Sequence, residues 1–381
     1  MSTVFRGRDT RLVRDVAIKV LRLDSKRTAD ARIAYVNEAR VLSYLSHPGV
    51  PPIYDCGTTC NGMPYHVMKL LRGQTLGQIL LAGNCTPARL LGIFADVAQT
   101  MAFAHSRCVI HLDLKPDNIM VGAFREVYVM DWGLARFEST APPESGGLPD
   151  DFGTDAGRYP IAGTPAYMSP EQARGESLDP RADVFELGGL LCEILIGQAP
   201  YSGENVEQVH RRALNASVGD LLDVLEVCDT DRALVRLVKR CLAPHRRNRP
   251  RDATEVADAV SAYQDTALQR AESDMNRFFE LSLDLFCIAD FEGYFRRINS
   301  NFSRILGYSD HELLARSFMN FIHPDDIQQT MATMAALDEG QSVVRFNNRY
   351  RTAHGRYVVL EWTAKAVPNE NVIFAVARDI T

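Results

Sequence analysis

The sequence lacks a long apolar run and any excess of positive charge. Its longest strongly apolar stretch, Leu187 to Gly197, is too short to span a bilayer and contains Glu193. The formal net charge of −6 argues against a general nucleic-acid or membrane-surface role. We therefore predict a protein with no membrane span and no nucleic-acid partner.

Clusters of metal-binding side chains are also missing. The eight cysteines are scattered, and the closest pair, Cys56 and Cys60, has no second pair or histidine cluster to complete a zinc site. Buried, reduced thiols are the expected state, which predicts a cytoplasmic location. With 381 residues, 24% of them charged and 46% hydrophobic, the chain has an ordinary globular composition and the length for two or three domains.

Secondary-structure patterns change along the first two thirds of the chain. Residues 1–70 mix short β-rich runs with one helical stretch, Ala29 to Leu45. Residues 86–122 predict a helix, a loop and a short strand. Residues 138–160 are rich in Gly, Pro, Ser and Asp, which predicts a mobile loop. Residues 170–265 are mostly helical, with apolar residues three and four apart.

A further helical pattern runs from Asp252 past Arg270 toward Phe279. Two interpretations are open: one amphipathic helix packed on its own domain, or a short coiled coil. The first is favoured, because the chain offers fewer than three clean heptads before Arg270 interrupts the spacing.

The pattern changes to β-hairpins after Phe278. Turns are predicted at Glu292-Gly293 and at His354-Gly355, each between two strand-like runs. A helix between the hairpins begins with a capping box formed by Ser309 and Glu312. These features predict a separate α+β domain of about 100 residues.

The strongest chemical signal is "HLDLKPDN" followed closely by "MDWG". Asp113 is a loop carboxylate that can orient a hydroxyl and accept its proton. Lys115 can reach the same site and neutralise a transferring anion. Asn118 and Asp131 offer the oxygen ligands that Mg²⁺ prefers beside phosphate oxygens. This combination of base, cation and metal ligands suits phosphoryl transfer.

These motifs resemble those of the bacterial branch of eukaryotic-type Ser/Thr protein kinases, and the resemblance covers roughly residues 1–262. The family carries a lysine in a V-A-I-K strand and a partner glutamate in a helix, which correspond here to Lys19 and Glu38. The resemblance implies an α+β fold of two lobes, a small β-rich one and a large helical one. It also implies ATP and Mg²⁺ as cofactors, with Asn118 and Asp131 as metal ligands.

The resemblance also assigns the nucleotide-binding positions. Met68 takes the gatekeeper place, and Lys69 to Leu71 form the hinge whose backbone meets adenine. The full implied set of nucleotide-contacting residues is Val4, Ala17, Lys19, Glu38, Met68, Lys69, Leu71 and Met120. The implied catalytic residues are Asp113, Lys115 and Thr164.

A substrate-docking segment is implied by "GTPAYMSPEQARGE". Glu171 in this segment is expected to pair with Arg249, and Asp183 is expected to anchor the catalytic loop from below. Lys115 and Thr164 are the residues that Ser/Thr kinases, rather than tyrosine kinases, carry at their positions. The implied partners are therefore protein substrates with Ser or Thr hydroxyls. Small-molecule phosphotransferases share the His-x-Asp and metal ligands, but the docking segment favours a protein substrate.

The phosphate-covering loop of the family is incomplete here. Ser2 stands where its third glycine belongs, so the first two glycines and the strand before them would lie upstream of Met1. Without that strand we expect residues 4–6 to have no strand partner. Met1 is therefore expected to be either a mis-assigned start or the cut edge of a longer chain, rather than the true N-terminus. The rival hypothesis is a degraded kinase with weak nucleotide affinity.

Two further residues depart from the family pattern. Leu112 replaces the arginine that usually grips a phosphate on the activation segment, which predicts altered regulation with the catalytic Asp113 intact. Trp132 replaces a phenylalanine, and as a large aromatic it is expected to fill the same apolar slot behind Asp131.

Residues 278–381 resemble a PAS sensor domain through "DLFCIADFEGYFRRIN", "ILGYSDHELL", "FIHPDD" and the terminal "VARDIT". The resemblance implies a five-stranded antiparallel sheet with helices over one face, used for small-ligand sensing or dimerisation. Because the flavin-binding cysteine motif is absent and Cys287 lies in a strand, no cofactor is predicted for this domain.

The predicted domains are a kinase domain at 1–262 lacking the first strand and most of the Gly-rich loop, a linker helix at 263–277, and a PAS domain at 278–381. The favoured function is a cytoplasmic Ser/Thr protein kinase using ATP and Mg²⁺, regulated by the PAS domain, with a homodimer through that domain or the linker helix. The alternative is a pseudokinase-like scaffold that binds nucleotide weakly and acts through PAS partners. A PAS-histidine kinase is excluded because its phospho-acceptor helix and ATPase motifs are missing.

Overall fold

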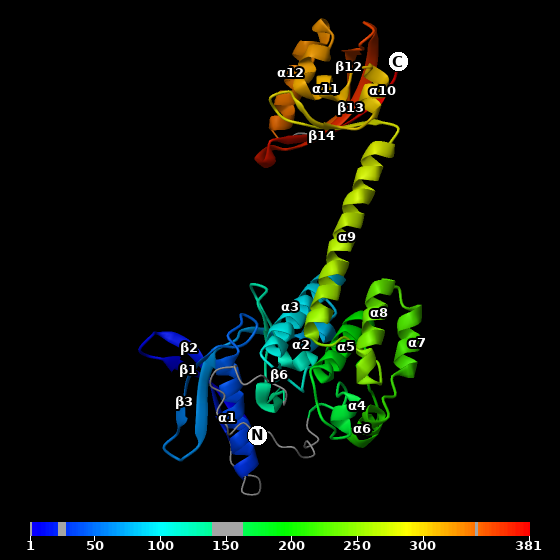
Figure 1. The fold of residues 1–381 in the computed structure, drawn as a ribbon. Helices are drawn as coiled ribbons and strands as arrows, with labels where there is room; N and C mark the ends of the chain where they lie inside the picture. Colours follow the sequence, from blue (N-terminus) through cyan, green and yellow to red (C-terminus); the bar gives the residue numbers. More distant parts are fainter. Residues whose placement is uncertain (1, 22–27, 139–162, 340–341) are drawn as a thin grey trace. The chain divides into compact units, whose positions relative to one another are not determined.

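The computed structural model describes residues 2–21, 28–138, 163–339 and 342–381. The chain forms two compact units, Met1–Asp265 and Thr266–Thr381, each with its own hydrophobic core (Figure 1). The loop predicted at 138–160 lies outside the described residues from residue 139 onward.

The first unit begins with a four-stranded antiparallel sheet. In spatial order its strands are β1 (Ser2–Asp9), β2 (Arg14–Leu21), β4 (Pro64–Lys69) and β3 (Ile53–Thr58). Helix α1 (Thr28–Tyr44) contacts β3 and β4. β2 carries the run "VAIKV", whose β-branched side chains suit a strand. This sheet forms the predicted β-rich lobe.

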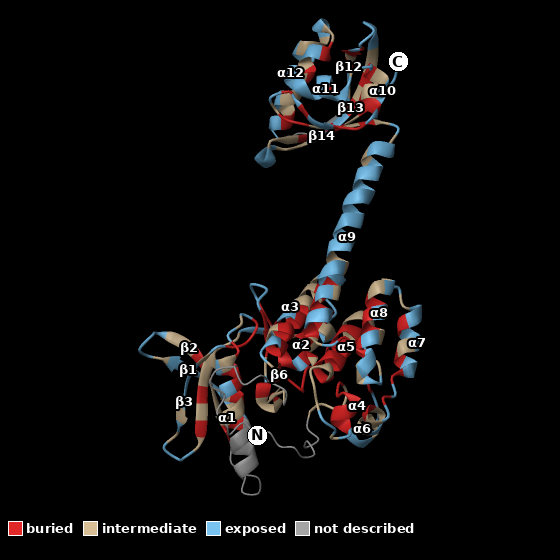
Figure 2. Cartoon of the chain, viewed as in Figure 1, coloured by how far each residue is buried: buried red, intermediate tan, exposed pale blue. Residues whose placement is uncertain are grey.

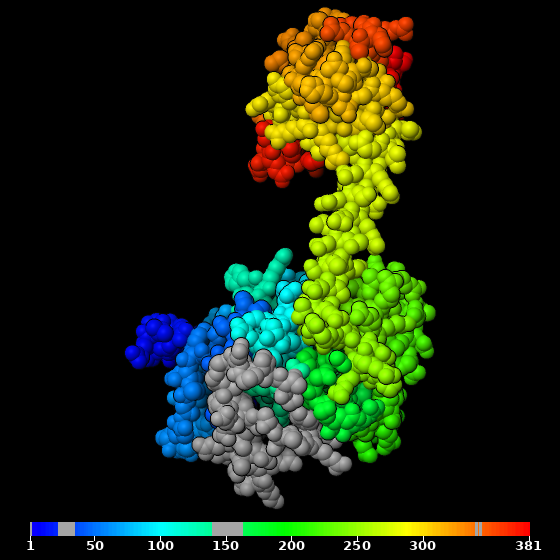
Figure 3. Space-filling model, viewed as in Figure 1, coloured from blue at the N-terminus to red at the C-terminus, as the bar shows by residue number. Residues whose placement is uncertain are grey.

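The expectation that residues 4–6 lack a strand partner is wrong. β1 pairs antiparallel with β2 along its whole length, from Ser2 opposite Leu21 to Asp9 opposite Arg14. Only residues 10–13 join the two strands, so the chain folds straight back and the ladder satisfies its backbone N–H and C=O groups. Figure 3 shows this hairpin in dark blue, standing out at the edge of its unit.

The remainder of the first unit is mainly helical. Its helices are α2 (Leu76–Ala82), α3 (Pro87–Ser106), α4 (Pro170–Ala173), α5 (Arg181–Ile196), α6 (Val206–Leu214), α7 (Gly219–Val227) and α8 (Arg232–Cys241). Two small sheets have the strand orders β5 (Gly73–Thr75), β7 (Ile119–Gly122), β8 (Val127–Val129) and β6 (Val109–Ile110), β9 (Arg136–Phe137). Short 3-10 turns are η1 (Pro116–Asn118), η2 (Trp132–Leu134) and η3 (Arg246–Asn248).

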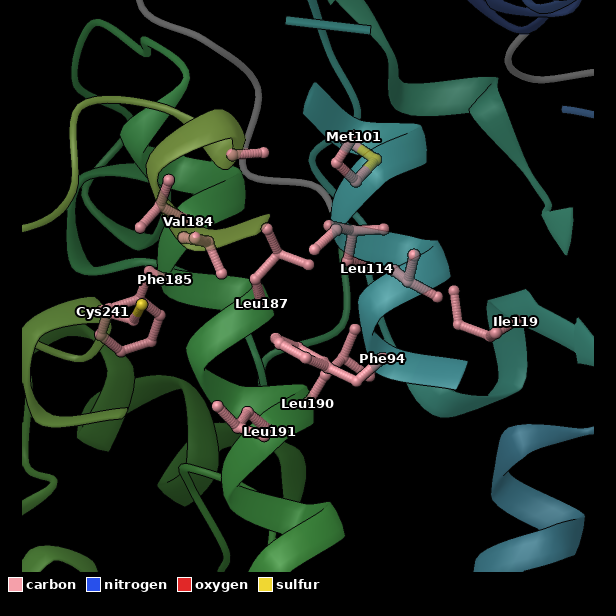
Figure 4. Packing of buried hydrophobic residues seen from close by; sticks show 14 of the residues in the cluster. Phe94, Met101, Leu114, Ile119, Val184, Phe185, Leu187, Leu190, Leu191 and Cys241 are labelled. Carbon is pink, nitrogen blue, oxygen red and sulfur yellow. The ribbon is translucent and has the colours of Figure 1, made fainter. Parts of the chain in front are cut away.

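Helix α5 is the central element of this helical lobe. Every residue from Ala182 to Cys192 is buried, as expected for a helix that packs against neighbours on all sides. It contacts α3, α7 and α8. Figure 4 shows Leu190 of α5 beside Phe94 of α3. Charged side chains on α5 are therefore buried inside the lobe, where they can hydrogen-bond to the neighbouring backbone.

Helix α9 (Ala253–Leu281) begins in the first unit and ends in the second. It is buried on one face from Ala253 to Val260, whereas the residues after Asp265 are almost all exposed (Figure 2). The predicted helix is confirmed. The prediction that it packs along its length on its own domain is wrong, because charged and amide side chains dominate from Gln264 onward and leave few apolar groups to bury.

The second unit contains a five-stranded antiparallel sheet. Its spatial order is β11 (Phe295–Ile298), β10 (Leu285–Ala289), β14 (Val372–Asp379), β13 (Tyr357–Val367) and β12 (Val343–Arg351). The helices are α10 (Asn301–Leu306), α11 (Asp310–Ala315) and α12 (Ile327–Asp338), with 3-10 turns η4 (Phe318–Phe321), η5 (Pro324–Asp326) and η6 (Pro368–Glu370).

Local signals in this unit are confirmed. Gly293 and Gly355 have φ of 89° and 81°, the left-handed conformation that the predicted hairpin turns require of glycine. The capping box is present, because Ser309 Oγ accepts from the Glu312 N–H while the Glu312 carboxylate accepts from the Ser309 N–H. Cys287 is buried in the core of this unit, as its strand position predicted.

All eight cysteines are free. Cys192, Cys241 and Cys287 are buried, but Cys56 and Cys60 are exposed, so the expectation of buried thiols is wrong for that pair. Cys56 lies on the edge strand β3 and Cys60 in the connection from β3 to β4, and both places offer little cover. Across the described residues, no helix is long and apolar enough to cross a membrane.

Candidate active site

The first half of the site joins the sheet to helix α1. Lys19 on β2 donates to Glu38 Oε1 on α1 across 2.5 Å, and its Nζ lies 3.3 Å from Asp131 Oδ1. Both partners of the Lys19–Glu38 pair are largely buried. Burial disfavours the lysine charge, but the neighbouring Glu38 and Asp131 carboxylates outweigh it and raise the pKa of Lys19. A fixed cation therefore faces the cleft.

Tyr35 is a residue of this half that the sequence reasoning missed. Its hydroxyl donates to the Lys19 carbonyl across 2.5 Å and accepts from the His66 N–H at 3.0 Å. It thereby ties α1 to both β2 and β4. Its position three residues before Glu38, on the same face of the helix, is the signal that could have revealed it.

The second half of the site is centred on the Asp113 carboxylate. Asp113 Oδ1 accepts from the Thr164 N–H at 2.9 Å and from Thr164 Oγ1 at 2.8 Å. Asp113 Oδ2 accepts from Lys115 Nζ at 2.8 Å and from Asn118 Nδ2 at 3.0 Å. Lys115 also donates to Thr164 Oγ1 at 2.6 Å. The three residues predicted as catalytic are thus in one hydrogen-bonded group with Asn118.

The catalytic loop is held from below by α5. Asp183 accepts from the N–H groups of His111 and Leu112 at 2.8 Å each, and its carboxylate contacts His105 Nε2 at the same distance. Its predicted role as anchor is confirmed. Leu112 has a left-handed backbone with φ of 68°, a strained conformation for a bulky residue. Its carbonyl also accepts from Gln172 Nε2 at 2.7 Å, so both backbone groups of Leu112 are fixed.

The side chains at the two departures from the family pattern are both buried. Leu112 packs with Ile110 and Ala182 in a small apolar cluster. Trp132 is buried against His111, with ring centroids 4.6 Å apart, and its Nε1 donates to the Val129 carbonyl. Trp132 therefore fills the apolar slot next to Asp131, as predicted.

The docking segment is fixed by a buried ion pair. Arg249 donates to both carboxylate oxygens of Glu171, at 2.6 and 2.9 Å, and is fully buried on its side chain. It also donates to three backbone carbonyls, so its charge is hydrogen-bonded on several sides. The expected pairing is confirmed. Breaking a buried pair of this kind by removing one partner costs about 3–5 kcal/mol.

A cleft lies between the two halves. Among the residues that line it are Lys19, Glu38, Asp113, Lys115, Asp131 and Thr164. Asp131 has a left-handed backbone with φ of 60°, and its side chain is half exposed toward this space. Asn118 lies just behind, and its carbonyl accepts from the Met130 N–H, which joins the two predicted metal-ligand segments. Ser2, at the position of the third glycine of the phosphate-covering loop, also lines the cleft, as do Leu21 and Leu134, which were not predicted from the sequence.

The other residues predicted to contact the nucleotide lie outside this lining. Ala17 and Met68 are opposite each other in the β2–β4 ladder, and Val4 is opposite Lys19 in the β1–β2 ladder. Lys69 turns its Nζ to the Tyr128 hydroxyl at 2.5 Å. Leu71 and Met120 are half-buried. Five of these residues lie on strands beside the site, and Leu71 lies in the connection between β4 and β5, so none of the six is in the polar cleft itself.

The two-lobed fold, the strand lysine paired with a helix glutamate and the carboxylate held on a looped segment together define a protein kinase. The protein kinase domain family matches residues 1–260, and the chain belongs to it. The PAS fold family matches residues 295–376, within the second unit.

Individual relatives carry kinase names. The chain is 40% identical over 209 residues to the serine/threonine-protein kinase PknB of Mycobacterium tuberculosis (strain ATCC 25618 / H37Rv), covering 54% of this chain and 32% of the relative. It is 41% identical over 209 residues to PknB of Mycolicibacterium smegmatis, with the same coverage. It is 29% identical over 286 residues to PknD of Protochlamydia amoebophila, covering 69% of this chain and 28% of the relative. The chain thus spans about a third of the length of these relatives.

Proposed function

We propose that this chain is a serine/threonine protein kinase that transfers the ATP γ-phosphate to protein hydroxyls. The observation that carries the proposal is the Asp113 carboxylate, fixed by Thr164, Lys115 and Asn118 and facing the cleft that holds Lys19 and Glu38. A carboxylate fixed on both oxygens presents one orientation to an incoming hydroxyl, which is the positioning that phosphoryl transfer needs.

Each polar group has one proposed task. Asp113 accepts the proton of the substrate hydroxyl, and Lys115, 2.8 Å away, stabilises the anion that develops on the transferred group. Lys19, held by Glu38, binds the phosphates of ATP. Thr164 keeps Asp113 oriented and belongs to the segment that meets the protein substrate.

The donor set fits Mg²⁺. Asp131 offers a half-exposed carboxylate. Asn118 donates its Nδ2 to Asp113, so its amide oxygen is the atom left to face a cation. Hard oxygen donors of this kind are what Mg²⁺ takes together with phosphate oxygens. When bound, the ion would neutralise charge on the phosphates.

The adenine end of ATP is proposed to lie along the bordering strands. The residues assigned to it are Val4, Ala17, Met68, Lys69, Leu71 and Met120. The support is the ladder that puts Ala17 beside Met68 two residues from Lys19, so one strand serves both ends of the nucleotide.

The alternative, a scaffold that binds nucleotide weakly, is less well supported. A chain freed from catalysis has no need to hold Lys19 against both Glu38 and Asp131, or to fix Asp113 through Thr164, yet all of these hydrogen bonds are present. A small-molecule phosphotransferase is also disfavoured, because Arg249 fixes the segment around Glu171 to the helical lobe, and Thr164 of the same segment donates to Asp113.

We further propose that the chain acts in the cytoplasm, with a kinase domain at 1–262, a linker helix at 263–277 and a regulatory PAS domain at 278–381. Two copies associate through the exposed part of α9. Leu268 and Met275 are 62% and 66% exposed, and their spacing of seven residues puts them on one face of the helix. Apolar side chains repeated in this way favour burial against a second copy.

The test is transfer of radiolabel from γ-labelled ATP to a Ser/Thr protein substrate. We expect incorporation by the wild-type chain and loss of it, by at least a hundredfold, in Asp131→Ala, since the proposed metal ligand is removed. Asp117→Ala, at a neighbouring acidic residue outside the Asp113 hydrogen-bonded group, is the control and is expected to keep activity. Wild-type transfer rates in Asp131→Ala would overturn the assignment.

A further inference from the structure

The backbone of the catalytic loop has its N–H groups satisfied by side chains. Residues 111–114 donate in order to Asp183 Oδ2, Asp183 Oδ1, His111 Nδ1 and Glu186 Oε2, at 2.8, 2.8, 3.2 and 2.7 Å. Two of these acceptors are carboxyl groups three residues apart on α5, so one helix holds three of the four N–H groups. Asp183 was expected in this role, and Glu186 was not.

The peptide bond that follows Asp113 is held at both of its polar groups. Its N–H, on Leu114, donates to Glu186 at 2.7 Å, and its carbonyl, on Asp113, accepts from Asn118 Nδ2 at 2.8 Å. A peptide plane fixed on both sides cannot rotate. The backbone on the C-terminal side of the Asp113 side chain is therefore locked, independently of the contacts that the carboxylate itself makes.

Glu186 lies in an apolar core, where a carboxyl group without a hydrogen bond would be destabilising. It is 1% exposed, and its neighbours along α5, Phe185 and Leu187, are completely buried. The side chain of Leu114 is also buried in this core, close to Phe94 and Met101 (Figure 4). Burying a polar group without a hydrogen bond destabilises the folded state. Its bond to the Leu114 N–H is thus the reason that this position can be a glutamate.

We propose that Glu186 is a positioning residue for phosphoryl transfer, which fixes Asp113 through the N–H of Leu114. The inference rests on the proposed kinase function. Glu186 does not touch the cleft, and it acts only through the backbone. Asp183 holds the loop before Asp113 and Glu186 holds it after, so that the base is fixed from both directions along the chain.

The charge state of Glu186 defines which substitutions are informative. Burial raises the pKa of Glu186 well above its ordinary value of 4.5, and Asp183 on the same helix and Asp113 on the loop raise it further. The Leu114 N–H and the Lys115 ammonium oppose them. A protonated carboxyl still accepts through its carbonyl oxygen. The essential feature is therefore the acceptor, and glutamine can supply it.

The experiment compares Glu186→Gln with Glu186→Met in the full chain. The two replacements have similar length, and only glutamine can accept from Leu114. We expect Glu186→Gln to keep kcat within about threefold of wild type. We expect Glu186→Met to lower kcat at least tenfold while KM for ATP stays within about twofold, because the ATP contacts are untouched. A Met variant with wild-type kcat would overturn the proposal.

The glutamine variant decides the question even if the methionine variant does not fold. A tenfold loss of kcat in Glu186→Gln, with wild-type melting temperature, would show that the acceptor is not what matters. A retained kcat supports the proposal, because the amide replaces the carboxyl as acceptor of the Leu114 N–H, the hydrogen bond that Glu186 makes among the described residues.

Amide hydrogen exchange of the peptide covering residues 111–118 gives a readout that does not depend on activity. Exchange is expected to be at least tenfold faster in Glu186→Met than in wild type or Glu186→Gln, and equal rates in all three would contradict the inference. If the wild-type chain transfers no phosphate, the proposed function fails, and the exchange result still reports on the Glu186 bond.

Discussion

The hydroxyl of Tyr35 on α1 donates to the backbone carbonyl of Lys19 on β2, 2.5 Å away. The same hydroxyl accepts from the His66 N–H, so one side chain contacts the backbone of two neighbouring strands, β2 and β4. Because α1 also carries Glu38, this contact fixes the helix that holds the ion pair of the site. Burial raises the pKa of Tyr35 and keeps its phenol protonated as a donor.

Tyr35→Phe is expected to destabilise the small lobe and to raise KM for ATP severalfold. The substitution leaves a buried N–H and a buried carbonyl without their partner, at a cost of about 1–3 kcal/mol. Urea unfolding and ATP titration measure the two effects. Tyr44→Phe, on the same helix with its ring packed on Phe137, is the matched control and is expected to change neither. Equal behaviour of the two variants would contradict the assigned role.

Glu186 is expected to make stability depend on pH. The folded state holds its proton more tightly than the unfolded state, so the free energy of unfolding falls as pH rises above about 4.5 toward the folded pKa. The slope is at most about 1.4 kcal/mol per pH unit for one group. Burial is the main cause of the raised pKa, the Asp183 and Asp113 carboxylates add to it, and the Leu114 N–H and Lys115 oppose it.

Glu186→Gln removes this titration. Its free energy of unfolding, measured in urea from pH 5 to pH 8, is therefore expected to rise relative to wild type as pH increases. The difference between the two proteins is the quantity to plot, because it cancels the titration of all other groups. Two parallel curves would show that Glu186 has the same proton affinity in both states.

Association of two copies through α9 is expected to depend on Leu268 and Met275. Replacing both with glutamate removes two apolar contacts worth about 1.5–3 kcal/mol each when fully buried, and should weaken the dimer at least tenfold. Light scattering across a concentration series measures this. Gln269→Glu with Ser273→Glu, on other faces of the same exposed segment, is the control and should leave the dimer intact. A wild-type chain that is monomeric at high concentration would disprove the association.

Phosphorylation is expected to have little effect on activity, because the position that usually receives the phosphate is Leu112. Its side chain is buried with Ile110 and Ala182 and offers no cation. Complete phosphatase treatment should change activity toward a peptide substrate less than twofold, with mass spectrometry confirming phosphate removal. A drop of fivefold or more would show that another cation performs this task.

The arrangement of side chains in the site could be predicted from the sequence where the residues are close together along the chain. Asp113, Lys115 and Asn118 lie within six positions, and their charges and donors leave few other arrangements. The Arg249–Glu171 pair, 78 positions apart, could be expected only through the resemblance to a family. Its two residues carry no local signal of their partnership.

Other features could not be predicted because they depend on which element ends up inside. A glutamate such as Glu186 in an apolar helix normally marks the solvent face, but α5 has no solvent face between Ala182 and Cys192. The pairing of β1 with β2 was missed for a related reason. A strand pairs with a free strand edge that its connection can reach. Here the connection between β1 and β2 is four residues long, so β1 pairs with β2.

Helix α5 is a shared support for two segments of the candidate active site. Asp183 and Glu186 hold the loop that carries Asp113, the proposed base, and Glu193, further along the same helix, accepts from the Tyr167 hydroxyl in the segment proposed to meet the substrate. Ten residues of α-helix span about 15 Å and behave as one stiff rod. When thermal motion shifts α5, it carries both attachments with it and leaves their separation unchanged. The proposed base and the proposed substrate-binding segment can therefore stay aligned with each other while the rest of the lobe fluctuates.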